Sequence, residues 1–107
     1  MFSGKTIHLA LLLVFYSSLT VFGQWFTANS GTTNNLNGGY LLDSGVGFVV
    51  GDAGTILKTT DAGMTWAPLV SGTANALYDV YFFDATQGVA VGEQGLILRT
   101  TDGGAGW

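Results

Sequence analysis

An internal repeat restricts the fold of this 107-residue chain more than any other feature. Residues 47–66 align with residues 88–107 at a spacing of 41 residues and without a gap, and 11 of the 20 aligned positions are identical. The register continues upstream, where residues 30–32 match residues 71–73 and Trp25 matches Trp66. Repeats of this length are units that bury their apolar faces by stacking on their neighbours. The repeat therefore predicts an array of similar units.

Each unit has the residue pattern of short β-strands. In the second unit, segments rich in β-branched, aromatic or small apolar residues predict strands over 77–83, 88–92 and 96–100, with Gly- or Asp-containing turns between them. The first unit continues past its tryptophan into a fourth strand over 67–70, and Pro68 places that strand at a sheet edge because proline cannot donate to a ladder. Its leading strand is weaker, since Asn37-Gly38-Gly39 interrupts it.

Four short strands in about 40–45 residues are the sequence signature of a β-propeller blade. We therefore expect an all-β fold of two four-stranded antiparallel blades of an incomplete β-propeller. Residues 24–66 are the first propeller repeat, and residues 67–107 are the second repeat, which ends before its last strand. Because propellers have about 4–8 blades, the remaining blades of a longer chain are one expected partner.

The first 23 residues have the parts of a secretory signal peptide. Lys5 provides the positive charge, residues 9–16 form an unbroken apolar run, and Gly23 is the small residue at the expected cleavage position. A transmembrane anchor, the main alternative, needs about 20 continuous apolar residues, and polar residues interrupt this stretch from Ser17 onward. A buried core helix would need a polar face. We expect a helical signal peptide over 1–23, export to the periplasm, cell surface or medium, and no membrane span after cleavage.

The turn that ends each unit resembles the Asp-box, or BNR repeat, whose pattern is Ser/Thr, any, Asp, any, Gly, any, Thr/Ser, aromatic. The first copy matches this pattern at Thr59, Asp61, Gly63, Thr65 and Trp66. The second copy matches at Thr100, Asp102, Gly104 and Trp107, but Gly106 replaces the threonine. With the Val-Gly-x-x-Gly turn and the Ile-Leu-Lys/Arg strand before it, each unit over 24–107 resembles the propeller family of the photosystem II stability/assembly factor and its relatives in secreted bacterial proteins.

Turn chemistry favours a structural role for these residues. An aspartate after a strand accepts hydrogen bonds from its own turn, a glycine allows a positive φ, and a tryptophan fills space between neighbouring sheets. Catalysis and calcium binding are the alternatives for Asp61 and Asp102. An active site occurs once, however, whereas these residues recur in each unit. The sequence therefore predicts no catalytic residue and no metal site.

Three further sets of residues are of interest, and the first two have two interpretations each. In one interpretation Lys58 and Arg99 bind an anionic partner. In the other they are charged residues of an outer strand, which protect its edge or pair with a turn carboxylate. The aromatic residues of the 77–83 strand form a recognition patch, or they alternate between the core and the neighbouring sheet. The repeated acidic residues are interpreted as solvated turn residues; they are Asp52, Glu93, Asp43 and Asp84.

Composition excludes several classes of function. A net charge of −4 with three Lys+Arg gives no footprint for nucleic acid. The absence of Cys excludes thiol nucleophiles and thiolate zinc sites, and the only histidine, His8, lies in the predicted signal. A sialidase site binds its substrate carboxylate with several arginines, and residues 24–107 contain only Arg99. The seven Asp+Glu permit a two-carboxylate glycosidase by count, but none pair outside the repeat pattern. We expect no enzyme and no cofactor.

The resemblance implies a non-catalytic scaffold that binds a protein partner, as a photosystem II assembly factor does. The alternative is a display or adhesion module, or an accessory domain of a larger secreted bacterial glycosidase or sorting-domain protein.

Overall fold

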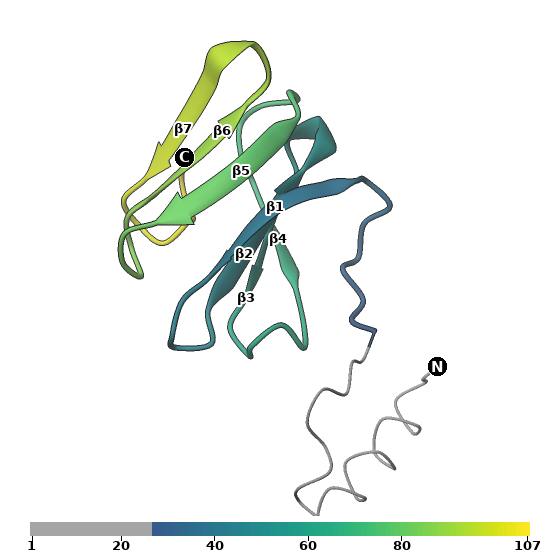
Figure 1. The fold of residues 1–107 in the computed structure, drawn as a ribbon, viewed down its shortest axis with the longest axis vertical. Coiled ribbons are helices and arrows are strands. Elements are labelled where there is room, and N and C mark those ends of the chain that lie inside the picture. Colours follow the sequence, from purple (N-terminus) through teal and green to yellow (C-terminus); the bar gives the residue numbers. More distant parts are fainter. Residues whose placement is uncertain (1–26) are drawn as a thin grey trace, which may run out of the picture.

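The computed structural model describes residues 27–107, which form two antiparallel β-sheets placed face to face (Figure 1). The predicted signal peptide and Trp25 lie outside the described residues. The first sheet has the order β1-β2-β3-β4 and the second has the order β5-β6-β7. The strands are β1 (Leu36–Leu41), β2 (Gly47–Gly51), β3 (Ile56–Thr59), β4 (Ala67–Leu69), β5 (Leu77–Phe82), β6 (Gly88–Gly92) and β7 (Leu96–Thr100). The all-β prediction of incomplete, antiparallel blades is confirmed.

The same tight connection joins the second and third strands of each sheet. These connections are the 3₁₀ turns η1 (Asp52–Gly54) and η2 (Glu93–Gly95). In both turns the central residue has a positive φ, 58° at Ala53 and 61° at Gln94. The equal geometry of the two turns shows that the sequence repeat is also a structural repeat.

The leading strand of the first sheet is not interrupted, contrary to the expectation from Asn37-Gly38-Gly39. β1 runs through both glycines, with one irregularity in register between Leu36 and Gly38. A Cβ atom on Gly38 would come within 2.6 Å of the Tyr78 carbonyl oxygen. The glycine therefore allows β1 and β5, the first strand of each sheet, to approach closely.

The fourth strand of the first sheet lies at its edge, as Pro68 predicted. β4 pairs only with β3, and Pro68 is opposite Leu57. Residues 70–76 then lead to β5 in the second sheet. Among the described residues, β7 has no strand on its outer side.

The apolar core lies between the two sheets. At its centre, the rings of Phe48 from β2 and Phe82 from β5 are stacked, with centroids 3.9 Å apart and planes inclined by 9°. Both side chains are fully buried. The other buried members of this core are Val50, Ile56, Leu77, Val80 and Ala90. Stacking one repeat on the next therefore provides the main hydrophobic stabilisation of the chain.

Candidate functional site

The turn at Thr59–Trp66 is organised by its aspartate. Asp61 Oδ1 accepts hydrogen bonds from Thr59 Oγ1 (2.7 Å) and the Thr65 N–H (2.9 Å), and Oδ2 accepts one from Thr65 Oγ1 (2.6 Å). Thr59 Oγ1 in turn accepts the N–H of Gly63, which has a φ of +93°. The hydrogen bonds to the ionised carboxyl, led by that from the Thr65 hydroxyl, lower the pKa of Asp61 from 3.8 to about 2.

The turn at Thr100–Trp107 repeats this arrangement with one donor fewer. Asp102 Oδ1 accepts hydrogen bonds from the Gly106 N–H (2.9 Å) and Thr100 Oγ1 (2.8 Å). The Gly106 N–H is the leading cause of a lowered pKa at Asp102. Gly106 has no hydroxyl to replace that of Thr65. Gly104 has a φ of +94°, as Gly63 does at +93°.

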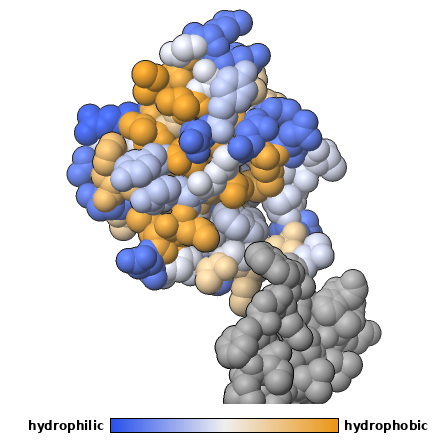
Figure 2. Space-filling model, viewed as in Figure 1, coloured by the Kyte–Doolittle hydropathy of each residue, from blue (hydrophilic) through white to orange (hydrophobic). Residues whose placement is uncertain are grey.

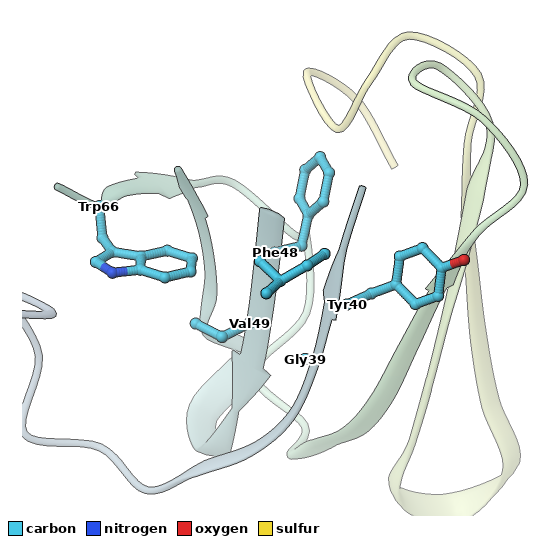
Figure 3. A pocket seen from close by; sticks show the side chains of 6 residues that line it. Gly39, Tyr40, Phe48, Val49 and Trp66 are labelled. Atoms are coloured by element: carbon cyan, nitrogen blue, oxygen red, sulfur yellow. The ribbon is translucent and has the colours of Figure 1, made fainter. Parts of the chain in front are cut away.

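The two tryptophans occupy equivalent positions, but only one of them lies between the sheets. Trp107 packs edge-on against Phe82, with ring centroids 6.0 Å apart and planes at 88°. Its Nε1 is buried without a hydrogen-bond partner. Trp66 lies on the opposite face of the first sheet, away from the second sheet (Figure 3). The expectation that both tryptophans fill the space between sheets is thus correct for Trp107 only.

Trp66 borders an open apolar groove of about 530 Å³. The groove runs over the outer face of the first sheet, where Gly39, Leu41 and Val49 also line it. In Figure 3, Tyr40 and Phe48 point toward the second sheet, whereas Val49 and Trp66 lie on the far side of the strands. This groove is not predictable from the sequence, because only the pairing and stacking of the strands show which face of β2 is left uncovered.

Lys58 joins the two sheets and does not pair with a carboxylate. Its Nζ donates a hydrogen bond to the Gly103 carbonyl at 3.1 Å and lies 5.5 Å from the centroid of the Phe48 ring. Its counterpart Arg99 is exposed, and within residues 27–107 its guanidinium donates a hydrogen bond to the Gln87 amide oxygen at 3.5 Å. Pairing with a turn carboxylate, one of the interpretations from sequence, is therefore wrong for both residues.

Three of the four repeated acidic residues stabilise local structure and are more than solvated turn residues; they are Asp52, Glu93 and Asp84. Asp52 accepts hydrogen bonds from the side-chain amides of Asn35 and Asn37, which fixes η1 to the start of β1. Glu93 accepts the backbone N–H of Ala76 just before β5. Asp84 accepts the N–H groups of Thr86 and Gln87, and the bond from Thr86 is the first cause of its lowered pKa.

The aromatic residues of the 77–83 segment divide between core and surface. Phe82 is buried, whereas Tyr81 and Phe83 are exposed and in edge contact, with centroids 5.2 Å apart. Tyr81 also contacts Tyr40 of the first sheet, at 4.8 Å between centroids. We name Tyr40, Tyr81 and Phe83 the aromatic surface. Figure 2 shows that apolar side chains also reach the surface on the face of the molecule that it draws.

Residues 27–107 contain no group of three or more His, Asp or Glu side chains arranged to hold a metal ion. No helix within this part of the chain is long and apolar enough to cross a membrane.

The arrangement of two similar antiparallel sheets stacked face to face defines two blades of a β-propeller. A solved structure described as YCF48 bound to D1 peptide is similar to this chain, with a TM-score of 0.68 and 30% sequence identity over 78% of this chain. The similar region spans 27% of that YCF48 chain. No protein-family profile matches the sequence, and no curated protein matches it. The chain thus resembles the YCF48 propeller in fold, with 30% identity over the aligned residues.

Proposed function

We propose that this chain is a non-catalytic, exported β-propeller module that binds a protein partner as a scaffold. The aromatic surface is the observation on which this proposal depends. Tyr81 and Phe83 are exposed and contact one another, and the half-buried Tyr40 lies against Tyr81. Such side chains offer large apolar area at a small cost in side-chain entropy, and they are enriched where proteins bind one another.

The hydrogen bonds of the aspartates support the non-catalytic part of the proposal. Both oxygens of Asp61 accept hydrogen bonds from its own turn, and Oδ1 of Asp102 accepts two such hydrogen bonds in the second unit. A carboxylate whose pKa is lowered by such bonds remains ionised and is a poor proton donor or acceptor near neutral pH. These groups therefore suit turn stabilisation better than acid–base chemistry.

The solved YCF48 structure contains a D1 peptide, and its similarity suggests the kind of partner. We propose that this chain also binds an extended peptide segment of a protein, at the aromatic surface. Because the similarity spans 27% of the YCF48 chain, we treat the D1 peptide as a probe of peptide binding.

Binding of the D1 peptide to the full chain tests this proposal, with Phe83→Ala as the diagnostic variant. Phe83 is 64% exposed, so its removal leaves the core intact. We expect about tenfold weaker binding, the typical effect of removing an aromatic contact at an interface. Met64→Ala is the matched control, since Met64 is 68% exposed and lies in the Thr59–Trp66 turn. No binding by the wild-type chain, or equal binding by both variants, would contradict the proposal.

Export is tested independently by the mass of the secreted chain. The signal-like residues 1–23 lead us to expect Gln24 at the N-terminus of the exported protein. Recovery of an intact Met1 form in the membrane fraction would instead indicate an uncleaved anchor.

A further inference from the structure

Asn37 is the one asparagine of this sequence that is followed by glycine. The other asparagines precede serine, asparagine, leucine or alanine; they are Asn29, Asn34, Asn35 and Asn75. An asparagine side chain is hydrolysed by attack of the next residue's backbone nitrogen on the side-chain amide carbon. Glycine hinders this attack least, because it has no Cβ atom and the freest backbone. The pair Asn37-Gly38 therefore contains the most reactive side-chain amide of the sequence.

The same two residues lie at the contact between the two sheets. Asn37 Nδ2 donates hydrogen bonds to Asp52 Oδ1 at 3.0 Å and to the Leu77 carbonyl oxygen at 2.9 Å. Gly38 lies against β5, where a Cβ atom would come within 2.6 Å of the Tyr78 carbonyl oxygen. The contact thus uses a side-chain amide at position 37 and a glycine at position 38. Packing between the repeats therefore retains a pair of residues that is chemically labile.

The folded strand opposes the reaction that the sequence favours. Ring closure requires the Gly38 nitrogen to reach Asn37 Cγ, which turns the backbone of Asn37 out of the extended conformation. Both residues lie within β1, and Gly38 is paired with Val50 of β2. Side chains of a strand stand away from its backbone, and the two acceptors of the Asn37 amide hold it in that position. The amide therefore becomes reactive when β1 separates from its neighbours.

We propose that Asn37 is a deamidation site, which is protected while the two sheets are packed together and reacts when they separate. In the open state the Gly38 nitrogen loses its proton to hydroxide and bonds to Asn37 Cγ. The bond from Cγ to Nδ2 breaks, and ammonia leaves with a proton from water. Water then adds to either carbonyl carbon of the succinimide ring and opens it to aspartate or isoaspartate. The net change is hydrolysis of the amide by water, and it is independent of peptide binding at the aromatic surface.

The product of deamidation does not restore the contact between the sheets. A carboxylate at position 37 has no N–H to donate, and it faces Asp52 and the Leu77 carbonyl, which are both acceptors. The two carboxylates repel one another, and the carbonyl loses its donor. Isoaspartate also inserts a methylene group into the backbone of β1 and shifts residues 38–41 relative to β2. Deamidation therefore converts a temporary separation of the two repeats into a lasting one.

Peptide mapping of the full chain by mass spectrometry tests the site and its protection. The chain is kept at mildly alkaline pH, either folded in buffer or unfolded in urea, and the conversion of each asparagine is followed over time. We expect Asn37 to convert in urea and at least about tenfold more slowly in buffer, because reaction then requires opening. Asn35 is the internal control, since it is also exposed and donates to Asp52 at 3.2 Å, but Leu36 follows it. Equal rates for Asn37 in the two samples, or for Asn37 and Asn35 in urea, would overturn the proposal.

Asp52→Ala tests whether the contacts of the amide provide the protection. This variant removes one acceptor of Asn37, so we expect conversion of Asn37 to be about fivefold faster in the folded chain and unchanged in urea. Asp84→Ala is the matched control for loss of a carboxylate, because Asp84 accepts hydrogen bonds from its own turn, at Thr86 and Gln87. It should accelerate the conversion clearly less. Equal acceleration by the two variants would show that general stability, and not the contact at Asn37, sets the rate.

Unfolding of Asn37→Asp in urea measures the consequence of deamidation. Asn37→Ser is its control, because it removes the amide without adding a charge. We expect a lower urea midpoint for Asn37→Asp than for Asn37→Ser at neutral pH. The difference should shrink as the pH falls below about 4, where the new carboxyl becomes protonated. A midpoint of Asn37→Asp equal to that of the wild type would show that the contact accommodates the carboxylate, and the lasting separation of the repeats would then be wrong.

Discussion

Asp61 stabilises its turn through its ionised carboxyl, and this makes its contribution dependent on pH. Its pKa in the folded chain is about 2, below the ordinary value of 3.8. The unfolded chain therefore binds a proton more readily, and the contribution is complete above about pH 4 and is lost as the pH falls toward 2. The difference in melting temperature between the wild type and Asp61→Asn should be largest at neutral pH and shrink over this range. A difference that does not change with pH would contradict the role of the charge.

The roles of individual turn residues were predictable because they depend on neighbours in sequence. The partners of Asp61 are Thr59 and Thr65, and Gly63 has the positive φ that the turn needs. Lys58 shows the limit of this reasoning. Its partner is the Gly103 carbonyl, 45 residues later, and nothing in the local pattern distinguishes that acceptor from a nearby carboxylate.

At the scale of elements, the two 3₁₀ turns have the same backbone and different surroundings. Gly54 lies against Thr73, whereas Gly95 faces open space. Gly54→Ala should therefore destabilise the chain by about 3 kcal/mol, through a steric clash and a strained φ. Gly95→Ala should cost only the strain, about 1–2 kcal/mol. Urea unfolding under conditions that keep the chain monomeric measures both, and equal losses would show that the close contact at Gly54 is unimportant.

The two tryptophans offer a similar comparison between equivalent elements. Trp107 contacts Phe82 in the core, while Trp66 borders an open groove. Trp107→Ala should cost about 3 kcal/mol, as removal of a large core side chain does, and Trp66→Ala should cost clearly less in the monomer. Thermal unfolding at low protein concentration distinguishes them. A larger loss for Trp66→Ala would mean that the outer face contributes more to stability than the contact between the sheets.

Strand positions were predictable from the repeat, but the exposure of each face was not. The 41-residue register assigns the same strands to both units, and the structure confirms them from β5 to β7. The register does not state which face of a terminal repeat lacks a neighbour. Phe82 and Leu41 occupy equivalent positions, but Phe82 is 1% exposed and Leu41 is 68% exposed. The difference arises because Phe82 faces the first sheet, whereas Leu41 lies on the uncovered face of the first sheet.

At the scale of the whole molecule, β3 and β7 are equivalent strands in unequal positions. β3 is paired on both sides, with β2 and β4, whereas β7 is paired only with β6 among the described residues. An unpaired strand edge presents free N–H and C=O groups that another chain can pair with. Among the described residues, the outward N–H groups of β7 therefore have no strand partner, whereas those of β3 face β4.

Amide hydrogen exchange should therefore separate β3 from β7. We expect the amides of β3 to exchange slowly, because β2 and β4 pair with this strand on its two sides. In β7, the N–H groups that pair with β6 should also exchange slowly, whereas the outward N–H groups should exchange at least about tenfold faster than their counterparts in β3, since no local opening is needed to expose them. Outward β7 amides that exchange as slowly as those of β3 would show that this strand edge is covered.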